Sequence, residues 1–391
     1  MLIQRTTDSR IYLGGDLHIR SGGVAASGVV YLFKELFADA SGPPITLPRT
    51  AVPGPGTLSG TQTRTFTITN GYLQADSGGS VGWSTQIVST QAQTRAAGLS
   101  MTWKEYLTNA ANQTICGWSS SITGPDSNGL YGVFHPASLA SWQPYAADGA
   151  VATVPDPFVI DTWYTWQVVL RATGAFFYLK GGVYTNWQLV WVTPNSTTAT
   201  LYGVYSKFTV AHAMRMDELK ISQLGAPFLA DSTIATQLVT TAVSGTTYAG
   251  VADGIFDLTV TAANPLALTG ELRFRVQDAS NYWTAYFAAD GSFNLDSVAA
   301  GVATNRITVA SVITAAALRI IRVRSHGSKI NCYTRTSATA SWTKRGAEIN
   351  VSHLDTLTDV VPVVGAGWTL GALHVWNRTP ATDAITALDT L

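Results

Sequence analysis

Three aromatic residues stand beside polar, loop-like sequence, where their rings could contact a sugar. Trp118 ends a predicted strand and is followed by three serines, while Trp142 and Tyr145 lie in a long irregular segment, 135–161, with Ser, Gln and Asp close by. An exposed aromatic face with hydrogen-bonding side chains around it can stack on a sugar ring when a rigid scaffold holds it. We therefore take Trp118, Trp142 and Tyr145 as candidate carbohydrate-binding residues. The alternative is that the segment folds back and buries the rings of Trp142 and Tyr145 as a lid on the core.

The groups that usually carry out catalysis are scattered along the chain. The sequence contains no G-x-S-x-G motif, and none of its six histidines has a metal-ligand spacing such as H-x-x-x-H. Of the five glutamates, only Glu35 and Glu218 stand near an aspartate, Asp39 and Asp217 respectively. The sequence therefore predicts a protein that is not an enzyme and has no cofactor.

Composition and charge exclude several classes of partner. Charged residues make up 12% of the chain, against about 25% in an ordinary soluble protein. The 24 basic and 24 acidic side chains cancel, and no basic stripe is present that would attract phosphates or an anionic membrane. We expect neither nucleic acid nor a membrane as a partner, and we expect Cys116 and Cys332 to be buried thiols.

The elements that would position these residues are short β-strands. Segments 163–171, 175–180 and 183–191 alternate apolar and polar residues and are separated by glycine-containing turns, which predicts a three-stranded antiparallel meander. The alternation places Trp187, Leu189 and Trp191 on one face of the third strand. Asn70-Gly71 predicts a tight hairpin between two further strands.

Two halves of the chain share one pattern. Arg171 and Arg324 each begin an R-x-x-G turn, and each turn is followed by a tryptophan, Trp187 and Trp342 respectively. Leu36-Phe37-Ala38-Asp39 near the start of the first half and Phe228-Leu229-Ala230-Asp231 near the start of the second add a second anchor. We predict an N-terminal arm at 1–31, two domains at 32–225 and 226–380, and a tail at 381–391.

These motifs resemble those of a known family. An F-x-A-D opening, the N-G-x-L hairpin, D-x-x-N-Y-W at 278–283 and D-G-S-F-N-L at 290–295 are similar to concanavalin A-like jelly rolls of the laminin-G or glucanase type, in particular the tandem domains of phage tail and capsid accessory proteins. The resemblance implies an all-β fold with two tandem antiparallel β-sandwich (jelly-roll) domains and an N-terminal arm.

The same resemblance supplies expectations about the site and the partners. It implies a calcium site between the first and last strands of the first domain, formed here by Asp39 and Asp217. Retaining glycosidases of this fold use E-x-D-x-x-E, which this sequence lacks.

We expect a non-catalytic virion structural protein, such as a decoration, fibre or tail accessory protein. We expect it to bind host-surface glycans, to join other virion proteins through its arm and to form homo-oligomers. Because the N-terminus lacks the apolar run of a signal peptide, we expect the virion protein to be made in the host cytoplasm. The alternative is a lectin-like or glycan-degrading bacterial protein.

Overall fold

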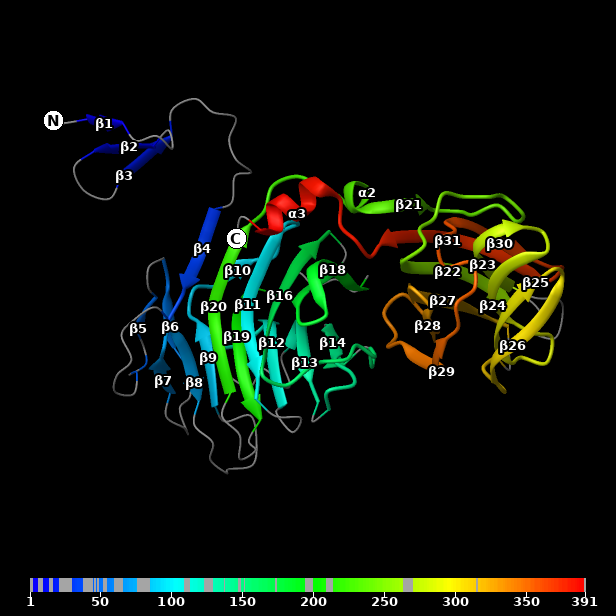
Figure 1. Cartoon of the computed structure of the whole chain (residues 1–391), viewed down its shortest axis with the longest axis horizontal. Coiled ribbons are helices and arrows are strands. Elements are labelled where there is room, and N and C mark those ends of the chain that lie inside the picture. The colour runs from blue at the N-terminus through cyan, green and yellow to red at the C-terminus, as the bar shows by residue number, and fades with distance from the viewer. Residues whose placement is uncertain are drawn as a thin grey trace.

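Short strands of alternating apolar and polar residues make up most of this protein, as a computed structural model of the chain shows (Figure 1). The structure describes residues 3–5, 10–13, 17–20, 30–37, 45, 47, 49–51, 55–59, 66–75, 85–108, 113–122, 129–136, 138–146, 149–150, 152–172, 174–193, 200–208, 214–262, 270–313 and 316–389. All strand pairs in this part of the chain are antiparallel, so the predicted all-β class is confirmed.

Two sheets face each other in the first half of the chain. The nine-stranded sheet contains β5 (Arg49–Thr50), β6 (Thr57–Ser59), β9 (Thr85–Ser89), β10 (Gln93–Thr94), β12 (Gln113–Ser119), β13 (Gly129–His135), β14 (Gln143–Ala146), β15 (Gly149–Ala150) and β19 (Thr200–Phe208). The eight-stranded sheet contains β4 (Val30–Glu35), β7 (Phe66–Thr69), β8 (Tyr72–Ala75), β11 (Leu99–Leu107), β16 (Thr162–Arg171), β17 (Gly174–Gly181), β18 (Tyr184–Thr193) and β20 (Met214–Gln223). Their facing side chains form one apolar core, and we call this unit the first sandwich.

The second half forms two further sheets around a separate core. The six-stranded sheet contains β21 (Ala235–Val239), β22 (Gly254–Ala262), β27 (Ala317–His326), β28 (Lys329–Arg335), β29 (Thr343–Asn350) and β31 (Trp368–Asn377). The five-stranded sheet contains β23 (Gly270–Asp278), β24 (Asn281–Phe287), β25 (Phe293–Ala299), β26 (Val302–Val309) and β30 (Asp359–Val364). We call this unit the second sandwich, and Figure 1 shows the two sandwiches side by side.

Three short strands precede the first sandwich. They are β1 (Ile3–Arg5), β2 (Arg10–Leu13) and β3 (Leu17–Arg20), and among the described residues they pair only with one another. The next strand, β4, begins at Val30 and pairs with β20, so the first sandwich begins inside the segment that the sequence assigned to the arm.

The predicted meander is present as β16, β17 and β18, but one of its faces was predicted wrongly. A β-bulge lies where Phe177 pairs with Trp191 and the next residue, Tyr178, pairs with Leu189. The extra residue shifts the alternation, because a bulge changes the face to which the following side chains point. Trp191 consequently enters the core of the first sandwich, whereas Leu189 and Trp187 lie on the outer face.

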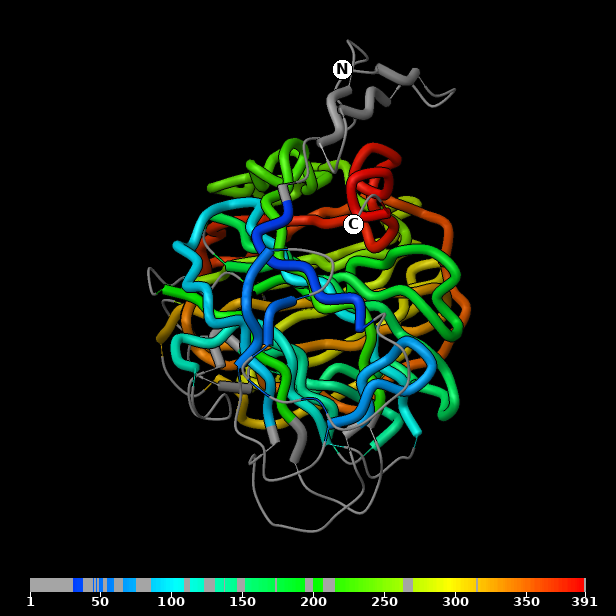
Figure 2. Tube along the Cα trace, turned by 90° about the vertical axis from the view of Figure 1, so that its left-hand side faces the viewer, coloured from blue at the N-terminus to red at the C-terminus, as the bar shows by residue number. Residues whose placement is uncertain are grey.

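The outer face of the meander is covered by residues from the second half of the chain. The linker leads through the short helix α2 (Asp231–Ile234) into the second sandwich, and the chain ends in helix α3 (Thr382–Asp389). Ala384, Ala387 and Leu388 share one buried face of α3 and pack with outer-face residues of the first sandwich and with Ile255 and Trp376 of the second. Figure 1 shows α3 near α2, where the two sandwiches meet, and Figure 2 shows the C-terminal segment at the upper edge of the molecule. The segment predicted only as a tail is therefore part of the junction.

Candidate functional site

The contact between the sandwiches is built around buried arginines, and Arg322 of β27 is the most enclosed of them. Its guanidinium binds both carboxylate oxygens of Asp257 at 2.6 Å and donates a hydrogen bond from Nη1 to the backbone oxygen of Val192 in the first sandwich at 2.7 Å. The guanidinium also lies over the rings of Trp191 and Trp342, 4.4 and 4.2 Å from their centroids. This arginine ties the two apolar cores together through a fixed geometry.

Both R-x-x-G anchors of the sequence also connect the two halves. Arg171, at the end of β16, is 4% exposed and binds both carboxylate oxygens of Asp231 in α2. Arg324, near the end of β27, is also 4% exposed and donates from Nη2 to Oδ1 and Oδ2 of Asp156 in the first sandwich, at 2.8 and 2.7 Å. The repeated arginine was thus a signal of the junction, but no pattern in the sequence indicated which aspartates it would bind.

Asp156 lies at the centre of a buried polar cluster. Besides Arg324, it accepts hydrogen bonds from Nε1 of Trp142 at 2.9 Å and from the hydroxyl of Tyr184 at 2.7 Å. Burial raises the pKa of Asp156, but the charges of Arg324 and Arg378 and these hydrogen bonds outweigh burial and lower the pKa to about 2. The carboxylate is therefore ionised at neutral pH.

Arg378 follows β31 and is held against the first sandwich. Its backbone oxygen accepts a hydrogen bond from the backbone N–H of Leu189 at 2.7 Å, and its Nε donates to Oε1 of Gln188 at 3.2 Å. Its Nη2 lies 3.6 Å from Oδ1 of Asp156 and has no hydrogen-bond acceptor within the described part of the chain, although the side chain is 2% exposed. A donor buried in this way can still bind a ligand.

A pocket of about 270 Å³ opens over this cluster between the sandwiches. Six of the lining residues are at most 5% exposed. One of them is Ser325, and we call the other five the floor; they are Asp156, Tyr184, Arg324, Asn331 and Arg378. Oδ1 of Asn331 has no donor partner among the described residues, whereas its Nδ2 donates to Glu348 at 2.8 Å. The floor thus presents both a donor and an acceptor that protein groups leave unused.

Four further residues, which we call the rim, line the pocket: Asp253, His326, Lys329 and Glu348. Asp253 pairs with Arg275 at 3.3 Å, and Glu348 pairs with Lys329 at 3.7 Å. Partial burial of the His326 ring, followed by the charge of Arg378, lowers its pKa to about 4, so the ring is neutral near pH 7. The rim therefore adds two carboxylates, and one of them, Asp253, shares the guanidinium of Arg275 with Asp355, which lies 2.9 Å from it.

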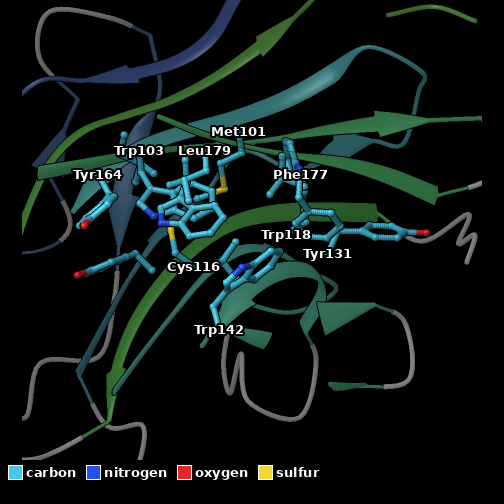
Figure 3. Close-up of a cluster of buried hydrophobic side chains, with 14 of the residues drawn as sticks. Met101, Trp103, Cys116, Trp118, Tyr131, Trp142, Tyr164, Phe177 and Leu179 are labelled. Carbon is cyan, nitrogen blue, oxygen red and sulfur yellow. The ribbon is translucent and has the colours of Figure 1, made fainter. Parts of the chain in front are cut away.

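Two of the three predicted sugar-binding aromatics are core residues, so the stacking hypothesis was wrong for them. Trp118 is 1% exposed and Trp142 is 0% exposed, and Figure 3 shows both among buried side chains of the first sandwich. The segment at 135–161 folds back on itself, because Trp142 and Val154 exchange backbone hydrogen bonds of 3.0 and 2.8 Å. The ring of Trp142 then packs on Trp166, with centroids 4.9 Å apart. Neither Trp118 nor Trp142 offers a face on which a sugar could stack.

Tyr145 has a different position from the two tryptophans. It lies in β14, is partly exposed, and contacts the ring of Phe134 edge to face with centroids 6.0 Å apart. It does not line the junction pocket. Sugar binding at Tyr145 stays a prediction.

The predicted calcium pair cannot be assembled from the described residues. Asp39 lies outside them, and Asp217, in β20, accepts a hydrogen bond from the backbone N–H of Glu218 at 2.8 Å. No group of three or more His, Cys, Asp or Glu side chains that could hold a metal ion occurs within the described ranges. Burial, followed by the charge of Glu218, raises the pKa of Asp217.

Comparison with known proteins finds only solved structures of low similarity. No family model matches the sequence, and no curated protein matches it. Solved structures with similar folds include a galectin from Caenorhabditis elegans (10% identity, TM-score 0.28, covering 35% of this chain and 94% of the galectin) and the exoplasmic/lumenal domain of VIP36 bound to Ca²⁺ and a mannose-containing glycan (10% identity, TM-score 0.33, covering 43% of this chain and 83% of that domain). A carbohydrate-binding module from Bacillus subtilis is similar at 15% identity and a TM-score of 0.25, covering 35% of this chain and 78% of the module.

These structures are concanavalin A-like jelly-roll sandwiches, and the likeness is one of fold. No helix among the described residues is long and apolar enough to cross a membrane. The sheets of the chain itself make it an all-β protein of antiparallel, jelly-roll-type β-sandwiches.

Proposed function

We propose that this protein is a non-catalytic structural protein of a phage particle and that it binds glycans of the host surface in the junction pocket. The observation that carries glycan binding is the floor of this pocket, where Nη2 of Arg378 and Oδ1 of Asn331 are buried and have no hydrogen-bond partner among the residues that the structure describes. Sugars present hydroxyl groups that both donate and accept hydrogen bonds, so they can satisfy both kinds of group at once.

The size of the pocket limits the ligand. Its volume of about 270 Å³ is slightly below the roughly 300–1,000 Å³ of pockets that hold drug-sized ligands. We expect one sugar residue, or the end of a longer glycan, to enter. A small site of this kind typically binds with millimolar to micromolar affinity.

The junction favours a preformed site. Arg322, Arg324 and Arg171 each bind a carboxylate across or beside the contact between the sandwiches, and the third apolar core fills the space beside them. A site whose walls are already ordered binds its ligand without paying to order them. The two sandwiches therefore act as one body that carries the pocket.

The virion part of the proposal rests on the sequence resemblance and on the N-terminal strands. β1, β2 and β3 pair with one another, which leaves two edge strands that have no partner in the described part of the chain. Exposed edges of this kind can add to a sheet of another subunit. We expect the arm to join other virion proteins in this way, and a symmetric assembly would place several copies side by side.

Glycan binding is tested by titrating the full chain with monosaccharides and by saturation-transfer NMR with a panel of host-surface glycans. Binding should weaken about tenfold, corresponding to the loss of one good hydrogen bond of about 1.4 kcal/mol, in Asn331→Ala. Asn305→Ala is the matched control, because Asn305 lies exposed in β26 of the other sheet. Absence of binding by every sugar at millimolar concentration would remove glycan recognition from the proposal.

The structural role is tested separately with a chain that lacks residues 1–29. Since β4 begins at Val30, this deletion should leave both sandwiches folded, with an unchanged melting temperature, while the protein is lost from purified particles. Genes for portal, capsid or tail proteins beside its coding sequence would support the same assignment. Normal incorporation of the truncated chain would contradict a role for the arm.

A further inference from the structure

The floor of the junction pocket holds more positive than negative charge. Arg324 and Arg378 both lie within ion-pair distance of a single carboxylate, Asp156, at 2.7 and 3.6 Å. All three side chains are at most 4% exposed, so water does not screen their charges fully. The other two floor residues, Tyr184 and Asn331, are neutral, which leaves one guanidinium charge without its own counter-ion.

The corresponding anchor in the other half provides a comparison within the same molecule. Arg171 also closes the junction, and it does so with one carboxylate, Asp231, for one guanidinium. In that anchor one carboxylate serves one guanidinium, whereas Asp156 serves both Arg324 and Arg378. Arg378 is an addition to this arrangement, and burying an extra guanidinium is costly unless something compensates it.

The rim carboxylates do not pair with the arginines of the floor. Asp253 accepts hydrogen bonds from Arg275 at 3.3 Å and from the backbone N–H of Gly327 at 2.8 Å, and Arg275 also pairs with Asp355 at 2.9 Å. Glu348 binds Lys329 at 3.7 Å and accepts a hydrogen bond from Asn331 at 2.8 Å. Neither rim carboxylate makes an ion pair with Arg324 or Arg378 within the described residues.

The unused hydrogen-bonding atoms identify the chemistry that would fit. Nη2 of Arg378 and Nε of Arg324 are buried donors without acceptors in the described part of the chain, and guanidinium donors match the oxygens of a carboxylate. Oδ1 of Asn331 is a buried acceptor without a donor, which a hydroxyl group would satisfy. A simple anion would use the first group and leave the second unpaired.

We infer that the junction pocket takes an acidic sugar, with the carboxylate bound to Arg378 and a ring hydroxyl bound to Asn331. This inference rests on the glycan binding proposed above and adds the class of glycan. A uronate is the smallest ligand with both groups, because it carries a carboxylate and hydroxyls on one ring. Arg378 would act as the ligand-binding residue, while Arg324 and Asp156 position it.

The decisive experiment compares matched ligands on the unmodified full chain by isothermal titration and saturation-transfer NMR. D-glucuronate should bind at least about tenfold more tightly than D-glucose, and D-glucuronamide, which keeps the shape without the charge, should bind like glucose. Acetate lacks the hydroxyls. The acetate concentration needed to displace bound glucuronate should therefore be at least about tenfold higher than the concentration of glucuronate at which the pocket is half occupied.

The outcomes separate this inference from the function on which it rests. Equal binding of glucose and glucuronate would overturn the inference and leave glycan binding intact, whereas no binding of any sugar would overturn glycan binding itself. Competition by acetate as strong as that by glucuronate would show a plain anion site and would also overturn the inference.

Variants locate the carboxylate within the pocket. Arg378→Gln should reduce the preference for glucuronate over glucose to about twofold or less, and Arg378→Lys should restore only part of it, because lysine lacks the planar fork of donors. Arg319 lies at the end of β27 opposite to Arg324 and does not line the pocket. Arg319→Gln removes one positive charge there and should leave the preference for glucuronate over glucose unchanged. An unchanged preference in a folded Arg378→Gln would overturn the assignment. If that variant does not fold, the ligand series on the unmodified chain decides the inference by itself.

Discussion

Asp156 and Arg324 are 168 residues apart in the chain, yet the carboxylate of one lies 2.8 and 2.7 Å from Nη2 of the other. Asp156 belongs to the segment that folds over the first sandwich, and Arg324 belongs to the second sandwich. Replacing such a pair by apolar residues of the same shape can be neutral, but removing one partner leaves a buried charge alone. The pair therefore fixes how the sandwiches meet more than it adds to their stability.

Removing the charge of Asp156 should destabilise the whole protein. Asp156→Asn leaves Arg324 and Arg378 buried without a counter-ion, and we expect the free energy of unfolding to fall by about 3–5 kcal/mol. Chemical denaturation measures this change. Asp359→Asn, at an exposed position of β30, is the control and should change stability by no more than about 0.5 kcal/mol. Equal stabilities of the two variants would contradict a structural role for the cluster.

The same carboxyl group should make stability depend on pH in the acid range. Arg324 and Arg378 overcome the effect of burial and lower the pKa of Asp156 from 3.8 to about 2 in the folded protein. A group whose pKa falls on folding contributes stability above its unfolded pKa, and that contribution is lost as the pH falls through the folded pKa. We expect a loss of roughly 2 kcal/mol between about pH 4 and pH 2, measured by denaturation at each pH. Asp156→Asn should lack this part of the pH profile, and an identical profile would show that another group titrates.

Helix α3 should contribute to stability through the third apolar core. Leu388 is 1% exposed and packs with residues of the meander's outer face. Leu388→Ala should lower the free energy of unfolding by about 2–5 kcal/mol, because it removes buried methyl groups and leaves a cavity. Leu318→Ala is the control, since Leu318 is 38% exposed, and its effect should stay below about 1 kcal/mol. A small effect of Leu388→Ala would mean that α3 is not docked in solution.

Trp142 should behave as a core residue and not as a sugar-binding one. Trp142→Phe keeps an aromatic ring but removes the Nε1 hydrogen bond to Asp156, which leaves a charged acceptor with one partner fewer. We expect a loss of about 1–3 kcal/mol in the free energy of unfolding. Trp163→Phe, at a partly exposed position of β16, should cost less than about 1 kcal/mol. Equal effects at the two positions would contradict the buried hydrogen bond.

Local features of the fold could be predicted from the sequence because they depend on neighbouring residues. Asn70-Gly71 forms the predicted hairpin, with φ angles of +51° and +80° and with Thr69 paired to Tyr72. These two residue types tolerate positive φ, and the alternating residues on either side supply the strands. The meander was predictable for the same reason.

The face of a strand was less predictable, since it depends on the partner strand. Trp187, Leu189 and Trp191 alternate correctly in sequence, but the bulge in the pairing of β17 with β18 places Trp191 on the opposite side from the other two. The polar-looking face of β16 is buried as well, with Gln167 0% exposed, because α3 and the second sandwich cover this side of the sheet. Neither the bulge nor the covering of this face by α3 and the second sandwich is visible as a pattern in the sequence of the strand.

The strand content, the hairpin, the balance of charge and the two arginine anchors could be recognised before folding, because they follow from residue type and short spacing. The burial of Trp118 and Trp142, and the convergence of Arg324 and Arg378 on Asp156, could not. Burial and ion pairing depend on distances in space, and the docking of two sandwiches joins residues whose separation in the chain carries no periodic signal.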